Sequence, residues 1–184
     1  FDFLAANTNY DNYYLRWTLS GPQGAVASNR PFRASDSSDG TSIFDLGPGE
    51  YTLTVQAPVD TTYAADITGS YSFRLLDLAS AGVLTPGTTV NATLTPSTET
   101  DAYRFDVVAG ERFYFDVTAR SGGDVYWRLL DPWGRPVFGP GVMNSTGDDV
   151  DVLELPFTGT YTLLVEGRYY TTGEASYAFN VSDV

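Results

Sequence analysis

The sequence predicts an all-β protein made of tandem antiparallel β-sandwiches of jelly-roll type. Large apolar and polar residues alternate with a period of two, which is typical of strands that bury one face. Turn-forming Gly, Pro, Asp and Asn separate these stretches, and no window shows a sustained helical period of 3.6 residues. Short strands at this spacing favour a sandwich or jelly roll. The expected strands are 51–55, 71–75, 102–108, 112–118, 125–130, 150–155 and 161–165.

The chain also repeats itself, which predicts two structural units. Residues 17–24, beginning Trp17-Thr18-Leu19, align with 127–134, beginning Trp127-Arg128-Leu129, at an offset of 110. Three further blocks follow in matching order: 49–55 with 159–165, 70–73 with 176–179, and 1–3 with 115–117. The offset drifts only by loop-sized insertions, so the blocks are expected to occupy equivalent strands.

The repeat divides the chain into a first unit at 1–78 and a second at 79–184, with a junction over 78–87. The first unit begins at a point equivalent to Phe115, so it lacks counterparts of the first two or three strands of the second unit. An incomplete sandwich exposes an apolar groove and unpaired strand edges. Two explanations stay open: upstream sequence has been cut off, or a neighbouring chain donates the missing strands.

Composition excludes several kinds of chemistry. The 184 residues carry 10 basic and 23 acidic side chains, for a net charge of −13, and they contain no Lys, His or Cys. Thiolate nucleophiles, zinc–thiolate sites, histidine bases and Schiff bases are therefore excluded. Carboxylates remain, which suit Ca²⁺ or two-carboxylate glycoside hydrolysis. A small sandwich without long loops leaves little room for a catalytic cleft, so we expect no enzyme and no cofactor other than Ca²⁺.

The acidic balance also restricts partners. Nucleic acid and anionic lipid both require a basic surface, so neither is expected. No apolar run approaches the roughly 18 residues of a membrane span. The expected partners are neighbouring repeats of the same protein, other assembly partners, a polysaccharide or a matrix protein.

Four motifs in the second unit resemble the bacterial pre-peptidase C-terminal domain. They have the forms D-x-Y-x-F, A-G, L-x-D-x-x-G and G-x-Y-x-L-x-V, and lie within 101–107, 109–113, 127–134 and 159–165. The resemblance covers nearly all of the second unit and the last two-thirds of the first. It implies a β-sandwich found beside secreted proteases and in tandem arrays of extracellular or surface proteins, some of which bind Ca²⁺ or collagen.

Acidic loops are the candidate Ca²⁺ sites, because a hard cation prefers oxygen ligands in a flexible turn. A Gly/Asp loop that precedes a strand contains Asp148, Asp149 and Asp151, and its counterpart in the first unit contains Asp36 and Asp39. Glu99 and Asp101 form a second cluster, near the strand entry where the resemblance places Ca²⁺-binding acids. The alternative is that these loops are solvated turns of an acidic protein.

Loop aromatics are the candidate ligand-binding residues, because aromatic faces beside polar side chains stack on sugars. They are Tyr10, Tyr13, Tyr14, Tyr63, Tyr169, Tyr170 and Trp133. The alternative is that the tyrosines cover the rim of the core. Trp17 and Trp127 stand at equivalent strand positions and are expected in the core.

Three Asn-x-Ser/Thr triplets mark glycosylation candidates at Asn91, Asn144 and Asn180. The favoured function is a non-catalytic structural or adhesive segment of a large extracellular or cell-surface protein, with strand complementation as a route of assembly. The alternative is an accessory module of a secreted enzyme that binds carbohydrate or protein and is stabilised by Ca²⁺.

Overall fold

The computed structural model describes residues 1–8, 15–32, 43–57, 68–143 and 147–184. Internal contacts divide the chain into two compact units, Phe1–Leu75 and Leu76–Val184. Tyr10, Tyr13, Tyr14, Asp36, Asp39, Tyr63 and Asn144, which the sequence marked as candidates, lie outside the described residues. In the described part of the chain, no helix has the length and apolar character needed to cross a membrane.

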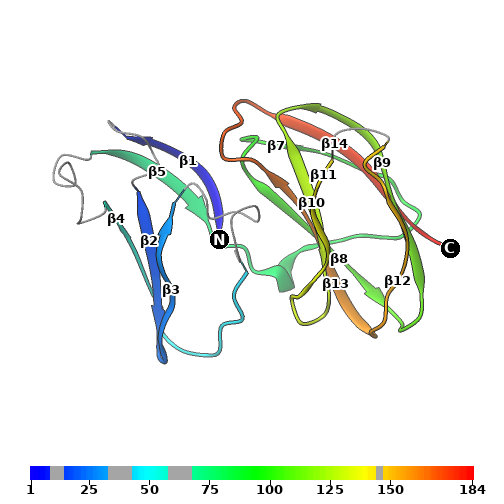
Figure 1. Ribbon diagram of the computed structural model, residues 1–184, viewed down its shortest axis with the longest axis horizontal. Coiled ribbons are helices and arrows are strands. Elements are labelled where there is room, and N and C mark those ends of the chain that lie inside the picture. The colour runs from blue at the N-terminus through cyan, green and yellow to red at the C-terminus, as the bar shows by residue number, and fades with distance from the viewer. Residues whose placement is uncertain (9–14, 33–42, 58–67, 144–146) are drawn as a thin grey trace. The chain divides into compact units, whose positions relative to one another are not determined.

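The second unit is a two-sheet sandwich (Figure 1). Its first sheet has the spatial order β11 (Pro136–Val142), β10 (Val125–Leu130), β13 (Gly159–Gly167), β8 (Thr100–Val107) and β6 (Gly82–Val83). Its second sheet has the order β12 (Val150–Glu154), β9 (Arg112–Gly122), β14 (Ala175–Asp183) and β7 (Val90–Leu94). From β7 to β14, this distribution of eight strands over two sheets is that of a jelly roll. The predicted fold class is confirmed.

The start of the second unit differs from the expected junction. The short 3-10 helix η4 (Leu78–Ser80) is capped by Asp77, whose side chain accepts a hydrogen bond from the Ala79 N–H. The chain then enters the first sheet as β6, which pairs with β8 in parallel, unlike the other strand pairs of the described residues. Leu84 follows and is 4% exposed within the core. Part of the expected junction is therefore an edge strand and a core contact.

The core of the second unit fills the space between its two sheets. Trp127 is 1% exposed and makes edge-on contacts with the rings of Phe115, Phe138 and Phe179. Along the first part of β9, buried residues alternate with more exposed ones, as the period-two pattern predicts. In β13 the alternation stops at Leu163, because residues 163–167 are all buried. Trp127 is therefore a core residue, as expected.

The first unit contains two smaller sheets. One pairs β1 (Asp2–Thr8) with β5 (Gly69–Arg74), and the other has the order β3 (Gly24–Pro31), β2 (Arg16–Gly21) and β4 (Thr52–Gln56). Trp17 is 1% exposed and stacks on Phe1 with ring centroids 4.3 Å apart. It is the core residue of this unit that the sequence predicts.

Strand registers coincide wherever the two units match in sequence. In the first unit Trp17 lies opposite Val55, and in the second Trp127 lies opposite Val165. The β1–β5 pair corresponds in the same way to the β9–β14 pair, with Phe3 opposite Phe73 and Val117 opposite Phe179. The matched sequence blocks therefore occupy matched positions in the strand pairing.

Candidate functional site

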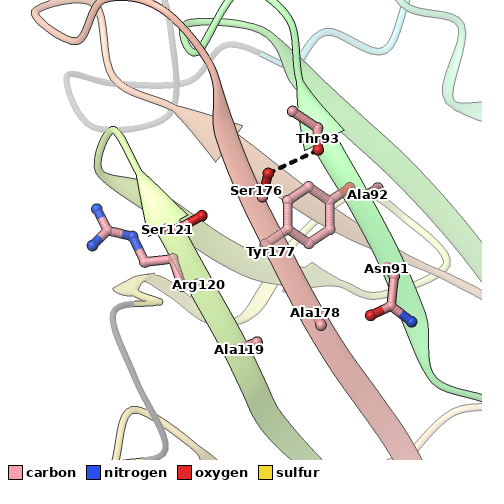
Figure 2. Close-up of a pocket in the computed structure, with 9 residues that line it drawn as sticks. All are labelled: Asn91, Ala92, Thr93, Ala119, Arg120, Ser121, Ser176, Tyr177 and Ala178. Atoms are coloured by element: carbon pink, nitrogen blue, oxygen red, sulfur yellow. Dashed lines mark hydrogen bonds between the residues drawn. The ribbon is translucent and has the colours of Figure 1, made fainter.

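A shallow hollow of about 440 Å³ lies on the outer face of the β7–β14–β9 sheet (Figure 2). Short side chains from three neighbouring strands form its floor, so the sheet surface is lower there than around it. Register places them in two cross-strand rows: Asn91, Ala178 and Ala119 in one, and Thr93, Ser176 and Ser121 in the other. The hollow follows from alternation, because the outward positions of these strands carry small residues.

The polar groups of the hollow are hydroxyls, an amide and one guanidinium. The Thr93 and Ser176 hydroxyls are joined by a hydrogen bond of 2.9 Å. Arg120 lies at the margin, where it donates to the Asp124 carboxylate at 3.0 Å and to the Gly123 carbonyl at 2.6 Å. No carboxylate is among the residues that line the hollow, so its floor can donate and accept hydrogen bonds but offers no acid–base pair.

A second candidate surface is built around the Arg168 guanidinium. Its central carbon lies 4.4 Å from the ring centroid of Tyr126 and 5.7 Å from that of Tyr170. The Tyr170 hydroxyl donates to Asp124 at 3.1 Å, and the Tyr170 ring contacts Tyr169 edge-on. Burial and the hydrogen bond to Asp124 raise the pKa of Tyr170 above 10.0, yet 52% of the residue is exposed.

Loop contacts hold this Arg168 cluster in place. The Ser97 and Thr171 hydroxyls are 3.0 Å apart, and the Thr171 hydroxyl also donates to the Arg168 carbonyl at 2.7 Å. Gly167 allows the close approach of the Ser97 segment, because a Cβ at Gly167 would collide with the Ser97 carbonyl. Tyr169 and Tyr170, which the sequence marked as candidate binding residues, therefore lie on a loop that is hydrogen-bonded to the buried Ser97.

Trp133 anchors a third surface, on the turn between β10 and β11. It is 61% exposed, and its ring lies edge-on to that of Phe157 with centroids 4.8 Å apart. The Arg135 guanidinium lies 4.9 Å from the Trp133 ring centroid and 5.4 Å from that of Phe157. This Trp133 cluster is an exposed aromatic surface that carries a cation.

The Asp131 carboxylate organises the turn that carries Trp133. It accepts hydrogen bonds from the backbone N–H groups of Trp133 and Arg135, both at 2.9 Å, and from the Arg135 side chain at 2.7 Å. Burial alone would raise the pKa of Asp131. The hydrogen bonds and the charge of Arg135 outweigh it and lower that pKa below 3.8.

The Asp148–Asp151 loop uses its central carboxylate to bind β9. Asp149 accepts a hydrogen bond from the Tyr114 hydroxyl and another from the Val117 N–H, both at 2.8 Å. The bond to Asp149 raises the pKa of Tyr114. Asp151 accepts from its neighbour, the Val152 N–H, at 2.7 Å. Among the residues that the structure describes, no three acidic side chains converge on a position that would suit a metal ion.

The second acidic pair is also engaged in hydrogen bonds. Glu99 accepts from the Thr95 N–H at 2.7 Å, and Asp101 accepts from the Tyr177 hydroxyl at 2.7 Å. The hydroxyls of Tyr177 and Tyr103 lie 2.5 Å apart. Burial is the main cause of the raised pKa of both tyrosines. Calcium binding by these acids stays a prediction.

The two described glycosylation candidates differ in their surroundings. Asn91 is exposed on the edge strand β7, where it lines the hollow. Asn180 lies on β14 between two strands, and its Oδ1 atom is buried. Glycosylation stays a prediction at both positions, and Asn91 offers the accessible side chain.

Sequence reasoning missed the hollow and the partners of the two clusters. Phe157 and Asp124 are distant in sequence from the aromatic residues that they contact, so the sequence gave no signal for them. Arg135 lies in the same turn as Trp133, but its position over the ring follows from its bonds to Asp131. The hollow did leave a signal: Ala119 and Ser121 alternate with larger residues on β9, as Ser176 and Ala178 do on β14. Small residues at successive outward positions predict a depressed sheet surface.

Neither a family model nor a curated protein matches the sequence. The structure is similar to the pre-peptidase C-terminal domain of collagenase from Bacillus anthracis, with 21% sequence identity and a TM-score of 0.45. The similarity covers 56% of this chain and 95% of that one. It is also similar to the periplasmic inhibitor of g-type lysozyme from Aeromonas hydrophila, with 13% sequence identity and a TM-score of 0.43. That similarity covers 56% of this chain and 96% of the inhibitor.

A third similarity spans 74% of this chain and 35% of a glycoside hydrolase family 43 arabinoxylan arabinofuranohydrolase from Bacillus subtilis, at 15% identity and a TM-score of 0.32. The pre-peptidase family thus remains a resemblance carried by the sequence motifs.

Proposed function

We propose that this chain is a non-catalytic structural or adhesive segment of a large extracellular or cell-surface protein, built from tandem β-sandwich units. The observation that carries the proposal is the shared register of the two units. Trp17 lies opposite Val55 as Trp127 lies opposite Val165, which supports one sandwich plan for both units. Proteins built from serial units of one plan typically form extended scaffolds with long binding surfaces.

The carboxylates of the described residues support a structural role. Asp131 holds a turn, Asp149 holds a loop against β9, and Asp101 accepts from a buried tyrosine. Each of these acids is thus occupied by hydrogen bonds that maintain the sandwich. The hollow, which is the concave surface described above, is lined without a carboxylate.

Charge and motif support the extracellular setting. A net charge of −13 keeps the chain soluble and discourages association with nucleic acid. The motifs resemble a domain of secreted and surface proteins.

Stretching single molecules tests the structural role. The C-terminal strand β14 pairs with β9 over nine residues and with β7 over five, so pulling on the C-terminus must break both sets together. We expect the unit Leu76–Val184 to unfold in one step, and at about 3.6 Å per residue it should release on the order of 400 Å of chain. A Phe179→Ala variant, which removes a fully buried ring, should lower the force of that step. Gradual extension at low force would argue against a structural role.

Incubation with casein, collagen and plant polysaccharides tests the absence of catalysis. We expect no product above that of heat-denatured protein. Turnover by the folded chain would overturn the non-catalytic assignment.

The Trp133 cluster favours a second candidate function, the binding of carbohydrate or protein. An exposed indole beside Phe157 and the Arg135 guanidinium offers an apolar face and hydrogen-bond donors together. A glycan array and matrix-protein panel should then give signals that Trp133→Ala weakens at least tenfold. The matched control is Tyr170→Ala, which alters the other exposed aromatic cluster. If both variants bind as the unaltered chain does, these clusters are not binding sites.

A further inference from the structure

The turn that carries Trp133 rests on a packing contact that each unit makes within itself. In the second unit, Pro132 lies so close to Gly159 that a Cβ on the glycine would collide with the proline ring. In the first unit, Pro22 lies against Gly49 in the same way. These residues match at the offset of 110 found in the sequence, so one scaffold of hairpin turn and loop is built in each unit.

The second unit adds an aromatic cluster to this scaffold, and the first unit does not. Gln23 stands at the position of Trp133, and Gly47 stands at the position of Phe157. Both segments of the first unit lie within its described residues. Because the scaffold forms there without either ring, its folding does not require the two rings of the second unit.

The turn itself is also built differently in the second unit. Gly21 pairs with Gly24 in the first unit, whereas the Asp131 N–H donates to the Arg135 carbonyl in the second, so the second turn is one residue longer. The Asp131 carboxylate, which Gly21 lacks, accepts from the N–H groups of Trp133 and Arg135. The longer turn and this carboxylate hold the indole and the guanidinium in place. Such coordinated changes on a shared scaffold point to a use for the cluster.

The geometry of the Trp133 cluster suits a sugar ring. Trp133 is 61% exposed and Phe157 is 38% exposed, and their ring planes meet at 89°, so they form two apolar walls at a right angle. The Arg135 side chain lies over both rings and stays 60% exposed. Aromatic faces pack against the C–H groups of a sugar, and a guanidinium donates hydrogen bonds to its hydroxyls.

Size and charge favour a neutral sugar chain over a protein or an acidic polysaccharide. If a whole aromatic residue offers about 250 Å², the exposed parts of Trp133 and Phe157 total roughly 250 Å². Each partner in a stable protein interface contributes about 800 Å². Arg135 is paired with Asp131 at 2.7 Å, so the cluster carries no net charge. The chain as a whole carries −13, which repels a polyanion.

We propose that the Trp133 cluster binds a neutral polysaccharide. One sugar ring would stack on the indole with Phe157 beside it, and Arg135 would donate to the sugar hydroxyls. The inference rests on the second proposed function, the binding of carbohydrate or protein, and narrows its ligand to neutral carbohydrate. It assigns the site to the second unit, because the first unit has the scaffold without the cluster.

Tryptophan fluorescence of the full chain tests the proposal. Of the three tryptophans, Trp17 and Trp127 are each 1% exposed, so Trp133 is the one that a surface ligand can reach. Neutral hexasaccharides of glucose, xylose, mannose and N-acetylglucosamine are the probes. We expect at least one of them to change the emission saturably and to reduce quenching by acrylamide at least twofold. Polygalacturonate and heparin at the same sugar concentration should change neither.

The first unit supplies the matched variant. Trp133→Gln combined with Phe157→Gly gives the second unit the side chains that the first unit carries on the same scaffold, so the variant should fold as judged by circular dichroism. Calorimetry, which needs no reporting indole, should show binding at least tenfold weaker. Trp133→Phe keeps an aromatic face and should lose less affinity than Trp133→Gln. Tyr170→Ala, in the other exposed aromatic cluster, should bind as the unaltered chain does.

Three results would overturn the proposal. The first is no binding of any neutral hexasaccharide at millimolar concentration. The second is equal binding by the double variant, which places the sugar elsewhere on the chain. The third is protection of Trp133 by an acidic polysaccharide or a matrix protein and by no neutral sugar. That third result would leave the broader binding function standing, whereas silence on the whole glycan and matrix-protein panel would remove both, so the two failures are distinguishable.

Discussion

Replacing Asp149 with alanine separates a structural carboxylate from a calcium ligand. The structure gives both oxygens of Asp149 a donor on β9, one from the Tyr114 hydroxyl and one from the Val117 N–H. The sequence offered two interpretations of this acidic loop, a Ca²⁺ site or a solvated turn, and gave no sign of these hydrogen bonds. Asp149→Ala removes the carboxylate and leaves the two donors without this acceptor.

The expected loss of stability follows from these two bonds. A hydrogen bond to a charged group contributes about 1.5–3 kcal/mol, and the half-buried position of Asp149 argues for the lower part of that range. Together we expect a loss of about 3 kcal/mol. For a unit of this size, roughly 4 °C per kcal/mol converts it to a decrease in Tm of about 12 °C.

Thermal melts followed by circular dichroism measure this effect, in EDTA and in millimolar Ca²⁺. Tyr114→Phe removes one of the two bonds and should cost about 1.5 kcal/mol. Asp151→Ala is the matched control in the same loop and should cost less than about 0.5 kcal/mol, because among the described residues the Asp151 carboxylate accepts from the adjacent Val152 N–H. The unaltered chain should shift by less than about 1 °C between the two buffers.

A different pattern would refute the reasoning. If Asp149→Ala matches the unaltered chain in EDTA, and only the unaltered chain gains stability from Ca²⁺, Asp149 is a metal ligand rather than a hydrogen-bonded clamp.

Three further predictions concern the second unit. Asp131→Asn should destabilise the protein at neutral pH, because the ionised Asp131 carboxylate, whose pKa is lowered, stabilises the fold. The difference in stability between the two proteins should shrink as pH falls below 3.8 toward the folded pKa of Asp131, and thermal melts across an acid pH series measure it. Tyr177→Phe should cost about 1–2 kcal/mol in urea unfolding, since it removes the 2.7 Å hydrogen bond to Asp101; an unchanged midpoint would contradict this. Trp127→Ala should cost about 3–5 kcal/mol in the same assay, because the ring is 1% exposed, and a loss below about 1 kcal/mol would show that the site collapses.

Alternation and repetition in the sequence predicted most of the fold. The matched blocks predicted which strands correspond, and the structure adds that Trp17 and Trp127 keep the same partners in register. Several strands were missing from the expected list, and for two of them, β6 and β11, the physical reason is plain. β6 is only two residues long, and β11 contains two prolines and two glycines within Pro136–Val142. Those residues disfavour a central strand, but β11 lies at a sheet edge, where proline costs no ladder bond.

The candidate sites were less predictable, because their partners come from distant segments. Asp149 and Tyr114 are 35 residues apart, and Tyr170 and Asp124 are 46 apart. The sequence marked Asp149 and Tyr170 as candidates, but only the sandwich brings each of them to its partner. An acid in a loop can therefore be recognised from sequence, whereas the group that it binds cannot.

Tyr71 and Tyr177 show most directly what sequence leaves undetermined. Each follows a serine and precedes a matched Phe two residues on, and each lies on the last strand of its unit's sandwich. Yet one is 47% exposed and the other 3% exposed. Residue type and strand register therefore do not by themselves decide how far a side chain is buried. In the second unit, β7 pairs with β14 beside Tyr177, and Asp101 and Tyr103 of β8 bond the Tyr177 hydroxyl.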